Sequence, residues 1–447
     1  MNDQKPKSAV SRRRFLQNVG VAGGVVVLGS SSSMRVFAAQ RPPAFKLGQI
    51  APMTGSAAEF GPFYREAAAL AVEQLNKAAE EVFGGPIIAG HVAEDTNTLP
   101  TPAIESGRKL VDADGVSVII GGWSSGVTTA VAESVSIPSG VLQISNGSTS
   151  PLISVLPSDR QADMLFRTTS SDALQGVVAA QLAAGEIMSN YKFESASTIF
   201  VNNPYGQGLS NAFSRSFQLR GGKIYAQVPH PEEVQPTYKS QLALALKDNP
   251  DLLVAVSYPG HTATYLKECR DFFEFTSWQF VDGNKSEKVL EAVGAKDLAG
   301  KLGTTPGQDP SIPAFQDFAK AYKARFNRDR IPPFTESAYD AAIAAGFAAA
   351  KAIVDGESNL TGTVLRDRLR NVSNPPGEVV NGGTQERITA GLRLIKQGKD
   401  VDYSGAAGAC NFDQNGDVIT PIALWEFTAG SEIKTVRIQA PNDIPAE

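Results

Sequence analysis

Short apolar runs alternate along the chain with longer segments in which apolar residues recur at helical spacing. Four runs in the first third are typical of strands buried on both faces: residues 45–50, 87–93, 116–120 and 141–145. The segments between them predict helices over residues 63–79, 103–111 and 127–134. This order indicates consecutive βαβ units, and therefore a parallel, doubly wound α/β sheet with right-handed crossovers.

The same alternation begins again after Arg167-Thr168-Thr169. We predict strands over residues 197–201, 223–228, 252–256 and 278–281, and helices over 173–191, 209–220, 238–247 and 262–273. Past Pro306 the pattern is helical over 314–326, 336–354 and 363–369, and residues 411–417 predict a hairpin turn between short strands. Two similar α/β halves suggest two lobes with a small-molecule site between them.

The third apolar run ends in a stretch that suits a binding site. Gly121 and Gly122 follow it, and the hydroxyl residues Ser124 and Ser125 come next, where a helix is predicted to begin. Glycine permits a sharp turn and close approach of another molecule. Free N–H groups at a helix N-terminus favour an anion. We interpret this stretch as the floor of a site at the carboxyl end of a strand.

The same residues also fit a second hypothesis. Gly122-Trp123-Ser124-Ser125-Gly126 matches G-x-S-x-G, the nucleophile turn of secreted serine hydrolases, with Ser124 as nucleophile. Such an enzyme needs a carboxylate and then a histidine after the serine. Only His230 and His261 follow Ser124, and neither is placed by its local sequence to reach it. A dinucleotide enzyme is disfavoured because G-x-G-x-x-G is absent.

The N-terminus predicts an export signal. Ser11-Arg12-Arg13-Arg14-Phe15-Leu16-Gln17 follows the twin-arginine motif, and a short apolar segment and the small-residue site Val36-Phe37-Ala38 come after it. We therefore expect residues 1–38 to be a signal peptide and the protein to be soluble in the periplasm. No cysteine lies near the predicted cut, so a lipid anchor is not expected.

Charge and cysteine content narrow the possible partners. Residues 1–38 hold six basic residues and one acidic residue, so the remaining chain has 35 basic and 45 acidic residues and a net charge of −10. This balance argues against nucleic acid or an anionic membrane as partner. Cys269 and Cys410 either form one disulfide or stay unpaired. The histidines are scattered, so we expect no metal site, and no cofactor.

Several motifs, in this order, resemble those of one known family. They are Gly48-Gln49-Ile50-Ala51-Pro52-Met53-Thr54-Gly55, Ile120-Gly121-Gly122 with Ser124-Ser125, Ile144-Ser145-Asn146-Gly147-Ser148-Thr149-Ser150-Pro151, Tyr205-Gly206-Gln207-Gly208, and Asn411-Phe412-Asp413 with Asn415-Gly416-Asp417. The chain resembles the type I periplasmic solute-binding proteins of ABC importers, in the leucine/isoleucine/valine-binding branch. The resemblance covers nearly all of the chain after the signal.

The resemblance implies two Rossmann-like lobes joined by three hinge crossings, with the ligand in the cleft between them. The crossings map near residues 167–169, 301–305 and 405–409. Lobe 1 would then comprise residues 44–167 plus 305–407, and lobe 2 residues 168–304 plus 408–447. The helices after Pro306 would therefore return to lobe 1.

The resemblance also implies roles for particular residues. It places Ser124 or Ser125, with Gly147 and Thr149, on the carboxylate of a ligand. It places aromatic side chains of the site at Phe60, Tyr205 and Tyr258.

This sequence departs from the family pattern at three places. The carboxylate that pairs with a ligand's ammonium maps to Val281-Asp282-Gly283-Asn284, so either Asp282 or Asn284 occupies that place. Trp123 stands beside the serines, where it could narrow the pocket or stack on a ring. The family's disulfide near this strand cannot form here, because the matching positions hold no cysteine.

We therefore expect the substrate-binding component of an ABC importer, not an enzyme. It would capture a small carboxylate-bearing solute, a branched-chain amino acid or a related organic acid or amide, by closure of the lobes. It would deliver this solute to permease subunits at the inner membrane. We expect a monomer.

Overall fold

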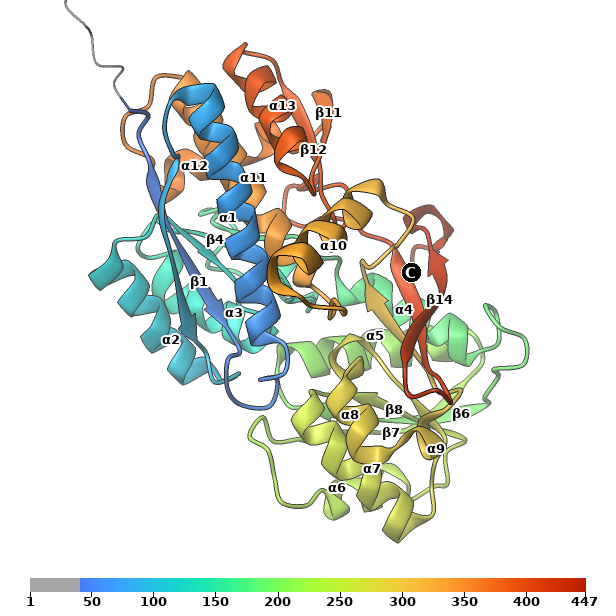
Figure 1. Cartoon of the computed structure of the whole chain (residues 1–447). Coiled ribbons are helices and arrows are strands. Elements are labelled where there is room, and N and C mark those ends of the chain that lie inside the picture. Colours follow the sequence, from blue (N-terminus) through green and yellow to red (C-terminus); the bar gives the residue numbers. More distant parts are fainter. Residues whose placement is uncertain (1–40) are drawn as a thin grey trace, which may run out of the picture. The chain divides into compact units, whose positions relative to one another are not determined.

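A five-stranded parallel sheet forms the centre of lobe 1, with the strand order β2-β1-β3-β4-β5 (Figure 1). The computed structural model describes residues 41–447, so the predicted signal peptide lies outside the described residues. The strands are β1 (Phe45–Ala51), β2 (Ile88–Asp95), β3 (Val118–Ile120), β4 (Leu142–Ser145) and β5 (Leu165–Arg167). The order reverses between β1 and β3, and ligands of open α/β sheets bind at such a reversal.

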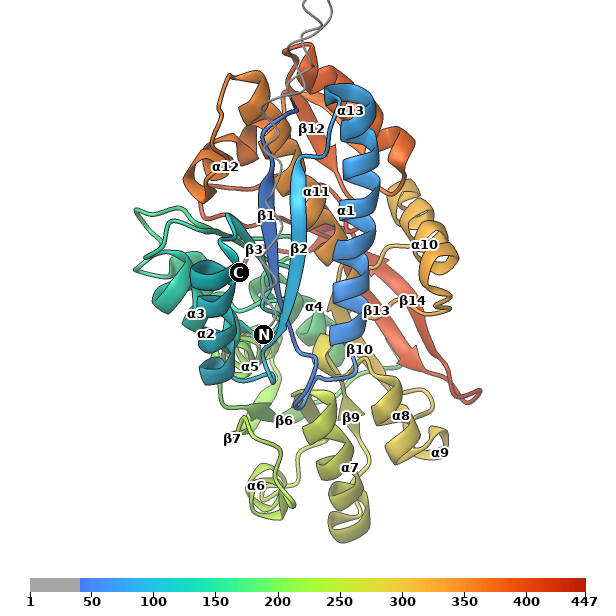
Figure 2. The ribbon, with the colours of Figure 1, turned by 60° about the vertical axis from the view of Figure 1, so that its left-hand side comes forward.

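Helices from both ends of the chain cover this sheet. They are α1 (Gly61–Phe83), α2 (Pro100–Arg108), α3 (Ser125–Val131), α10 (Pro313–Phe326), α11 (Thr335–Val354), α12 (Gly362–Leu369) and α13 (Gln385–Lys396). Helix α11 packs against α1, α12 and α13, and Figure 2 shows it alongside α1. The helices after Pro306 therefore pack against the same helices and sheet as α1.

Helix α11 is the core helix of lobe 1. Among residues 41–447 it is the one helix long and apolar enough to cross a membrane. Most of its residues are buried inside the protein, and the buried stretch from Ala338 to Ala350 is rich in alanine. Small alanine side chains let α1 and α13 approach α11 closely. At Gly346 there is no room for any side chain, because an added Cβ would lie 2.0 Å from Leu75 Cδ2 of α1. The apolar character of α11 thus follows from packing within the lobe.

Lobe 2 is built on a second parallel sheet, in the order β7-β6-β8-β9. Its strands are β6 (Ser195–Val201), β7 (Lys223–His230), β8 (Leu252–Val256) and β9 (Trp278–Gln279). Its helices are α4 (Asp172–Ala183), α5 (Pro204–Leu219), α6 (Lys239–Ala245), α7 (Pro259–Phe273), α8 (Glu287–Val293) and α9 (Ala295–Leu298). The two α/β halves predicted from the sequence are confirmed. Helix α4 ends at Ala183, earlier than predicted.

A small antiparallel sheet extends lobe 2, and the sequence did not reveal it. Strand β10 (Leu302–Pro306) pairs with β13 (Ile422–Phe427), which pairs with β14 (Ile433–Gln439). A further short pair, β11 (Glu378–Asn381) and β12 (Val401–Ser404), lies next to α13. The prediction of a hairpin over residues 411–417 is wrong, because irregular chain flanks that turn on both sides. The hairpin is β13–β14 instead.

The two cysteines remain unpaired thiols. Cys269 and Cys410 are both buried and free, and they belong to separate apolar clusters. Burial raises the pKa of the Cys269 thiol to about 11, and it raises the pKa of Cys410 as well. A thiol in such surroundings forms little thiolate and reacts slowly. The sequence left open a disulfide or two unpaired thiols, and the structure has two unpaired thiols.

A buried arginine joins three separate segments at the end of β5, near the first predicted crossing. Arg167, the last residue of β5, forms two bonds to the Asp417 carboxylate, at 2.7 Å from Nε and 2.8 Å from Nη2. Its Nη1 donates to the carbonyl oxygens of Ser148 (3.2 Å) and Ser150 (2.9 Å), and its Nη2 also donates to the Ser154 hydroxyl. The guanidinium therefore uses all five of its N–H groups. The 413–417 turn serves to present Asp417 to this arginine.

We expect Arg167→Met to destabilise the protein by about 3–5 kcal/mol, because it leaves Asp417 and two buried carbonyl groups without their partner. The control is Arg325→Met, which breaks the half-exposed pair with Glu73 and should change the stability little. Urea unfolding of both variants measures the difference. Equal losses would show that the Arg167 network contributes no more than a surface pair.

Candidate functional site

The turn after β3 is fixed by hydroxyl groups from neighbouring segments. The Gly122 carbonyl accepts hydrogen bonds from Ser145 (2.7 Å), Ser148 (3.1 Å) and Thr128 (3.1 Å). Gly121 has a φ of 107°, and a Cβ there would lie 2.2 Å from the Ile50 carbonyl oxygen. Only glycine fits this conformation and this close approach. The turn therefore holds the residues that follow it in one place, beside the 145–150 loop.

Ser124 contacts lobe 2 directly. The Tyr258 hydroxyl donates to Ser124 Oγ at 2.9 Å, and Asn203 Nδ2 donates to the same tyrosine oxygen at 3.0 Å. Tyr258 and Asn203 precede the first turns of α7 and α5, at the carboxyl ends of β8 and β6. The carboxyl ends of the two sheets thus meet at Ser124. Ser125 lies deeper, and its Oγ accepts from the Ser150 N–H at 3.2 Å.

The structure does not supply the base that the hydrolase hypothesis requires. His230 Nε2 is bonded to the Ser257 hydroxyl at 2.7 Å, and His261 Nε2 to the Glu232 carbonyl at 2.9 Å. Burial lowers the pKa of His230 to about 4 and that of His261 to about 3. The third histidine, His91, is bonded to Gln49. None of the three rings is bonded to Ser124, so no Ser–His pair is formed. Residues 41–447 also contain no cluster of His, Cys, Asp and Glu suited to a metal ion.

The four predicted aromatic residues form one continuous row across the lobes. Ring centroids are 5.4 Å apart for Phe60 and Trp123, 4.8 Å for Trp123 and Tyr258, and 5.5 Å for Tyr258 and Tyr205. Phe60 and Trp123 come from lobe 1, and the two tyrosines come from lobe 2. All four are buried. Such contacts stabilise an interface beyond the burial of area alone.

Gly147 makes room for Trp123. A Cβ on Gly147 would lie 2.3 Å from Trp123 Cδ1 and 3.3 Å from Phe334 Cγ. Gly147 therefore lies against both the Trp123 indole and Phe334, the residue before α11, which has a φ of 68°. The indole N–H has no hydrogen-bond partner in the protein, although it is buried. The sequence placed Trp123 near the site but did not reveal that Gly147 is the residue that accommodates it.

Asp282, not Asn284, faces the site. Its Oδ1 accepts from the Tyr205 hydroxyl at 3.0 Å and from Gln175 Nε2 at 2.8 Å. Asn284 is turned into lobe 2, where its amide donates to the Ser257 carbonyl (3.0 Å) and the Thr262 hydroxyl (2.7 Å). Of the two alternatives that the sequence left open, Asp282 is the one bonded to the predicted site residue Tyr205, and its role toward a ligand stays a prediction.

A second buried carboxylate lies beside Asp282. The Thr149 hydroxyl donates to Asp172 Oδ2 at 2.9 Å. Burial raises the pKa of Asp172 and raises that of Asp282 to about 6, and the charge of Asp282 raises the pKa of Asp172 further. Two side-chain oxygens, Asp172 Oδ1 and Gln175 Oε1, are buried without a hydrogen-bond partner. Neither carboxylate forms an ion pair with a described residue. Buried charges are normally paired, so this arrangement suits a cationic group.

Sequence reasoning missed Asp172 and Gln175. They lie three residues apart at the start of α4, and therefore on one face of the helix. The rest of α4 is rich in Ala, Val and Leu. Two polar residues on one face of an apolar helix, directly after a predicted crossing, were the available signal.

Glu336 is a third buried carboxyl group near the site. It stands in the first turn of α11, fully buried, and neither of its oxygens has a hydrogen-bond partner. Burial raises its pKa to about 8, although the nearby Lys285 opposes that shift. Its charge in turn contributes to the raised pKa of Tyr64. Glu336 is therefore largely protonated at neutral pH.

Two α/β lobes that meet through the carboxyl ends of their sheets define the bilobal class of solute-binding proteins. A family model described as periplasmic binding protein matches residues 44–415. The chain belongs to this family, the type I periplasmic binding proteins, in the branch of the Leu/Ile/Val-binding proteins. Members of the family are solute-binding proteins rather than enzymes.

Individual relatives agree with this placement. Leu/Ile/Val-binding protein homolog 3 of Brucella melitensis is 28% identical over 351 residues, which cover 74% of this chain and 90% of the relative. The chemotactic substrate-binding protein BasB of Halobacterium salinarum is 23% identical over 393 residues, 87% and 88% of the two chains. The crystal structure of a leucine-binding protein of Thermotoga maritima matches with a TM-score of 0.71 at 22% identity, covering 90% of this chain and all of that one.

We expect Gly147→Ala to destabilise the protein by about 1–3 kcal/mol, because the new methyl group would collide with the buried indole of Trp123. The control is Gly90→Ala, where nothing lies within 4 Å of the added Cβ, with an expected change of at most about 0.5 kcal/mol. Urea unfolding measures both. If the two variants were equally stable, Trp123 would be able to move aside at little cost.

We expect the contribution of Glu336 to stability to fall as pH rises from about 5 to 8. Its pKa is 4.5 in the unfolded chain and about 8 in the fold, so over this range the unfolded chain releases a proton that the fold retains. Glu336→Gln removes this contribution, so the variant should gain stability relative to wild type as the pH rises. Urea unfolding at both pH values tests this.

The control for the pH experiment is Glu105→Gln, an exposed site on α2. Lys285, the cation near Glu336, adds little to this pH dependence. It stays charged in the folded and the unfolded protein over most of the range, because burial lowers its pKa only to about 8. Parallel stability curves for wild type and Glu336→Gln would contradict the assignment.

Proposed function

We propose that this protein is the substrate-binding component of an ABC importer, and that it captures a small amino acid between its lobes. One observation carries the choice of an amino acid. Two buried carboxylates, Asp172 and Asp282, lie side by side in lobe 2 with no cation of the protein paired to them. A ligand ammonium group would supply the missing charge. A buried carboxylate pays a large desolvation cost unless such a partner is present.

The lobe 1 loops of the site suit the ligand carboxylate. Ser124, Ser125, Gly147 and Thr149 lie on two adjacent loops of lobe 1, and the Trp123 N–H is buried beside them without an acceptor. Hydroxyl and N–H groups stabilise a carboxylate through charge-assisted hydrogen bonds. The row formed by Phe60, Trp123, Tyr258 and Tyr205 would enclose the apolar part of the ligand.

Closure of the lobes would complete the site. In the proposed scheme the chain crosses between lobes near residues 167–169, 301–305 and 405–409, so lobe 1 comprises 44–167 plus 305–407 and lobe 2 comprises 168–304 plus 408–447. The described contacts across the cleft support a closed form, since Tyr258 reaches Ser124 and the Glu59 carboxylate accepts from the Glu287 N–H at 3.1 Å. Permease subunits would recognise this form.

The names of relatives support the class of ligand. The match from Brucella melitensis is called a Leu/Ile/Val-binding protein, and a Streptococcus pneumoniae neighbour with a TM-score of 0.68 was solved with isoleucine. A neighbour from Rhodopseudomonas palustris was solved with 3,4-dihydroxybenzoic acid, so organic acids belong in any ligand screen. We propose that the protein acts as a monomer in the periplasm and that residues 1–38 direct twin-arginine export.

Calorimetric titration with amino acids, their deaminated acids and their amides tests the proposal. We expect an amino acid of the leucine, isoleucine and valine group to bind, and the deaminated acid to bind far more weakly. Asp282→Asn should weaken amino-acid binding roughly ten- to hundred-fold, because it removes the charge opposite the ammonium. It should change binding of the deaminated acid much less.

The matched control is Asp248→Asn, an exposed carboxylate of lobe 2, which should leave the affinity unchanged. Binding of no amino acid in the panel would overturn the proposal. An amino-acid affinity that is insensitive to Asp282→Asn would overturn the ammonium assignment alone. Ester hydrolysis that Ser124→Ala abolishes would support the hydrolase hypothesis instead.

A further inference from the structure

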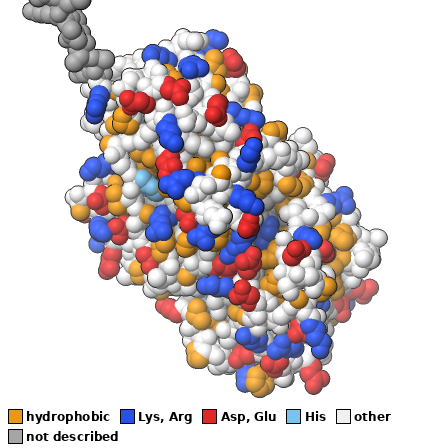
Figure 3. Space-filling view, viewed as in Figure 1, with side chains coloured by type: hydrophobic (Ala, Val, Ile, Leu, Met, Phe, Trp, Pro, Cys, Tyr) orange, Lys and Arg blue, Asp and Glu red, His pale blue; other side chains and the backbone are white. Residues whose placement is uncertain are grey.

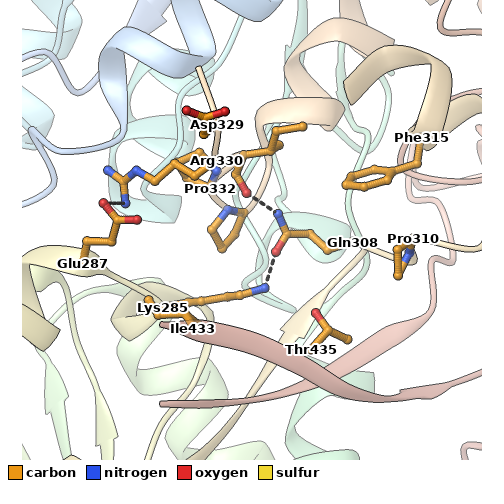
Figure 4. A pocket seen from close by; sticks show the side chains of 12 residues that line it. Lys285, Glu287, Gln308, Pro310, Phe315, Asp329, Arg330, Pro332, Ile433 and Thr435 are labelled. Atoms are coloured by element: carbon orange, nitrogen blue, oxygen red, sulfur yellow. Dashed lines mark hydrogen bonds and ion pairs between the residues drawn. The ribbon is translucent and has the colours of Figure 1, made fainter. Parts of the chain in front are cut away.

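A second pocket lies between the lobes, apart from the serine loops. It has a volume of about 360 Å³ and is lined by residues of three segments (Figure 4). Lys285 and Glu287 come from the loop and helix after β9, Ile433 and Thr435 come from β14, and the opposite wall comes from residues 308–333 of lobe 1. None of the predicted site residues lines this pocket. It is large enough for a small organic molecule.

Lys285 is the unpaired cation of this pocket. Its ammonium group donates to Gln308 Oε1, and Gln308 Nε2 donates in turn to the Ile331 carbonyl at 2.9 Å (Figure 4). Lys285 forms no ion pair with a described carboxylate. The side chain is only partly exposed. A lysine held by a neutral amide in a half-buried pocket lacks the anionic partner that such a charge normally has.

The other charged groups of the pocket are already paired. Arg330 bonds to the Glu59 carboxylate at 2.7 Å and to Glu287 at 3.1 Å. Asp329 bonds to Lys323 at 2.6 Å. Lys285 and Arg330 are the two basic residues among those that line the pocket, so the free positive charge is that of Lys285. Across the whole face of the molecule in the view of Figure 3, basic and acidic side chains are interspersed.

The remaining lining is largely apolar. Phe315, Pro310 and Pro332 stand around the pocket from the lobe 1 side (Figure 4). Ile433 lies on the lobe 2 side, and the hydroxyl residue Thr435 follows it on the same strand. A ligand that matches this lining has an apolar body and a single negative group directed at Lys285.

We propose that this pocket binds a small apolar monocarboxylate, held by Lys285 and enclosed by Phe315 and the prolines. Charge-assisted hydrogen bonds from an ammonium to a carboxylate are among the strong ones. Since both lobes line the pocket, a bound acid contacts both and stabilises their contact. The proposal does not depend on the amino-acid site, because the two sites share no residue.

Titration of the mature chain with benzoate, followed by calorimetry, tests the proposal. Lys285→Met keeps the apolar stem and removes the charge, so it should weaken benzoate binding roughly tenfold or more. The matched control is Lys434→Met, since Lys434 lies between Ile433 and Thr435 but is paired with Glu432 at 2.7 Å. That variant should bind benzoate like wild type. Benzamide, which has the same shape without the charge, should bind wild type as weakly as benzoate binds Lys285→Met.

Other outcomes would overturn the proposal. The proposal is wrong if benzoate does not bind, or if it binds Lys285→Met as tightly as wild type. If Ser124→Ala lowers the affinity and Lys285→Met does not, benzoate binds in the amino-acid site instead. Melting temperatures check that each variant is folded. Thr435→Phe provides a second test, because it narrows the pocket from β14 and leaves the charge in place. It should also weaken benzoate binding, and full affinity in that variant would contradict the proposal even if Lys285→Met did not fold.

Discussion

The Arg167 guanidinium is the interaction on which the geometry of the site depends. A buried guanidinium is tolerated only when its N–H groups are all used. Here they fix the end of β5, the carbonyl groups of the 148–150 loop and the turn that carries Asp417. The first of these segments leads into lobe 2, and the second carries Thr149. One charge therefore fixes both the end of β5 and the loop that carries Thr149. The 413–417 turn lies about 250 residues further along the chain than Arg167, and its Asp417 carboxylate binds the guanidinium.

The division of chemistry between the lobes follows from their positions in the chain. Lobe 1 contributes glycine turns and hydroxyl groups at the ends of β3 and β4, and no basic residue lies in those loops. Lobe 2 contributes the carboxylates Asp172 and Asp282, which are tied to Gln175 and Tyr205. Each lobe by itself would expose an incomplete set of polar groups. Only their contact brings hydroxyl groups, aromatic rings and carboxylates together.

Much of this architecture was predictable because the signals are local and repeated. Short Val- and Ile-rich runs indicated the buried parallel strands, and residues at their carboxyl ends had to meet at one edge of each sheet. That rule placed Ser124 at such an edge. The family resemblance, not the rule, assigned Thr149, Tyr205, Tyr258 and Asp282 to the same site. Strands β10 and β13 gave no comparable signal, since their partners lie about 120 residues apart in the chain. The turn at residues 413–417 resembled a hairpin, but its purpose is tertiary, to present Asp417. The fit of Trp123 against Gly147 depends on packing that no local pattern encodes.

The aromatic row also gives the protein a built-in optical probe. The chain has three tryptophans, and the other two, Trp278 and Trp425, are buried among the apolar residues of lobe 2. Trp123 alone lies where the lobes touch, with Tyr258 of the opposite lobe against its ring. Separation of the lobes would bring water to one indole and leave the other two in their apolar surroundings. The intrinsic emission spectrum therefore reports on opening through a single residue, without any attached label.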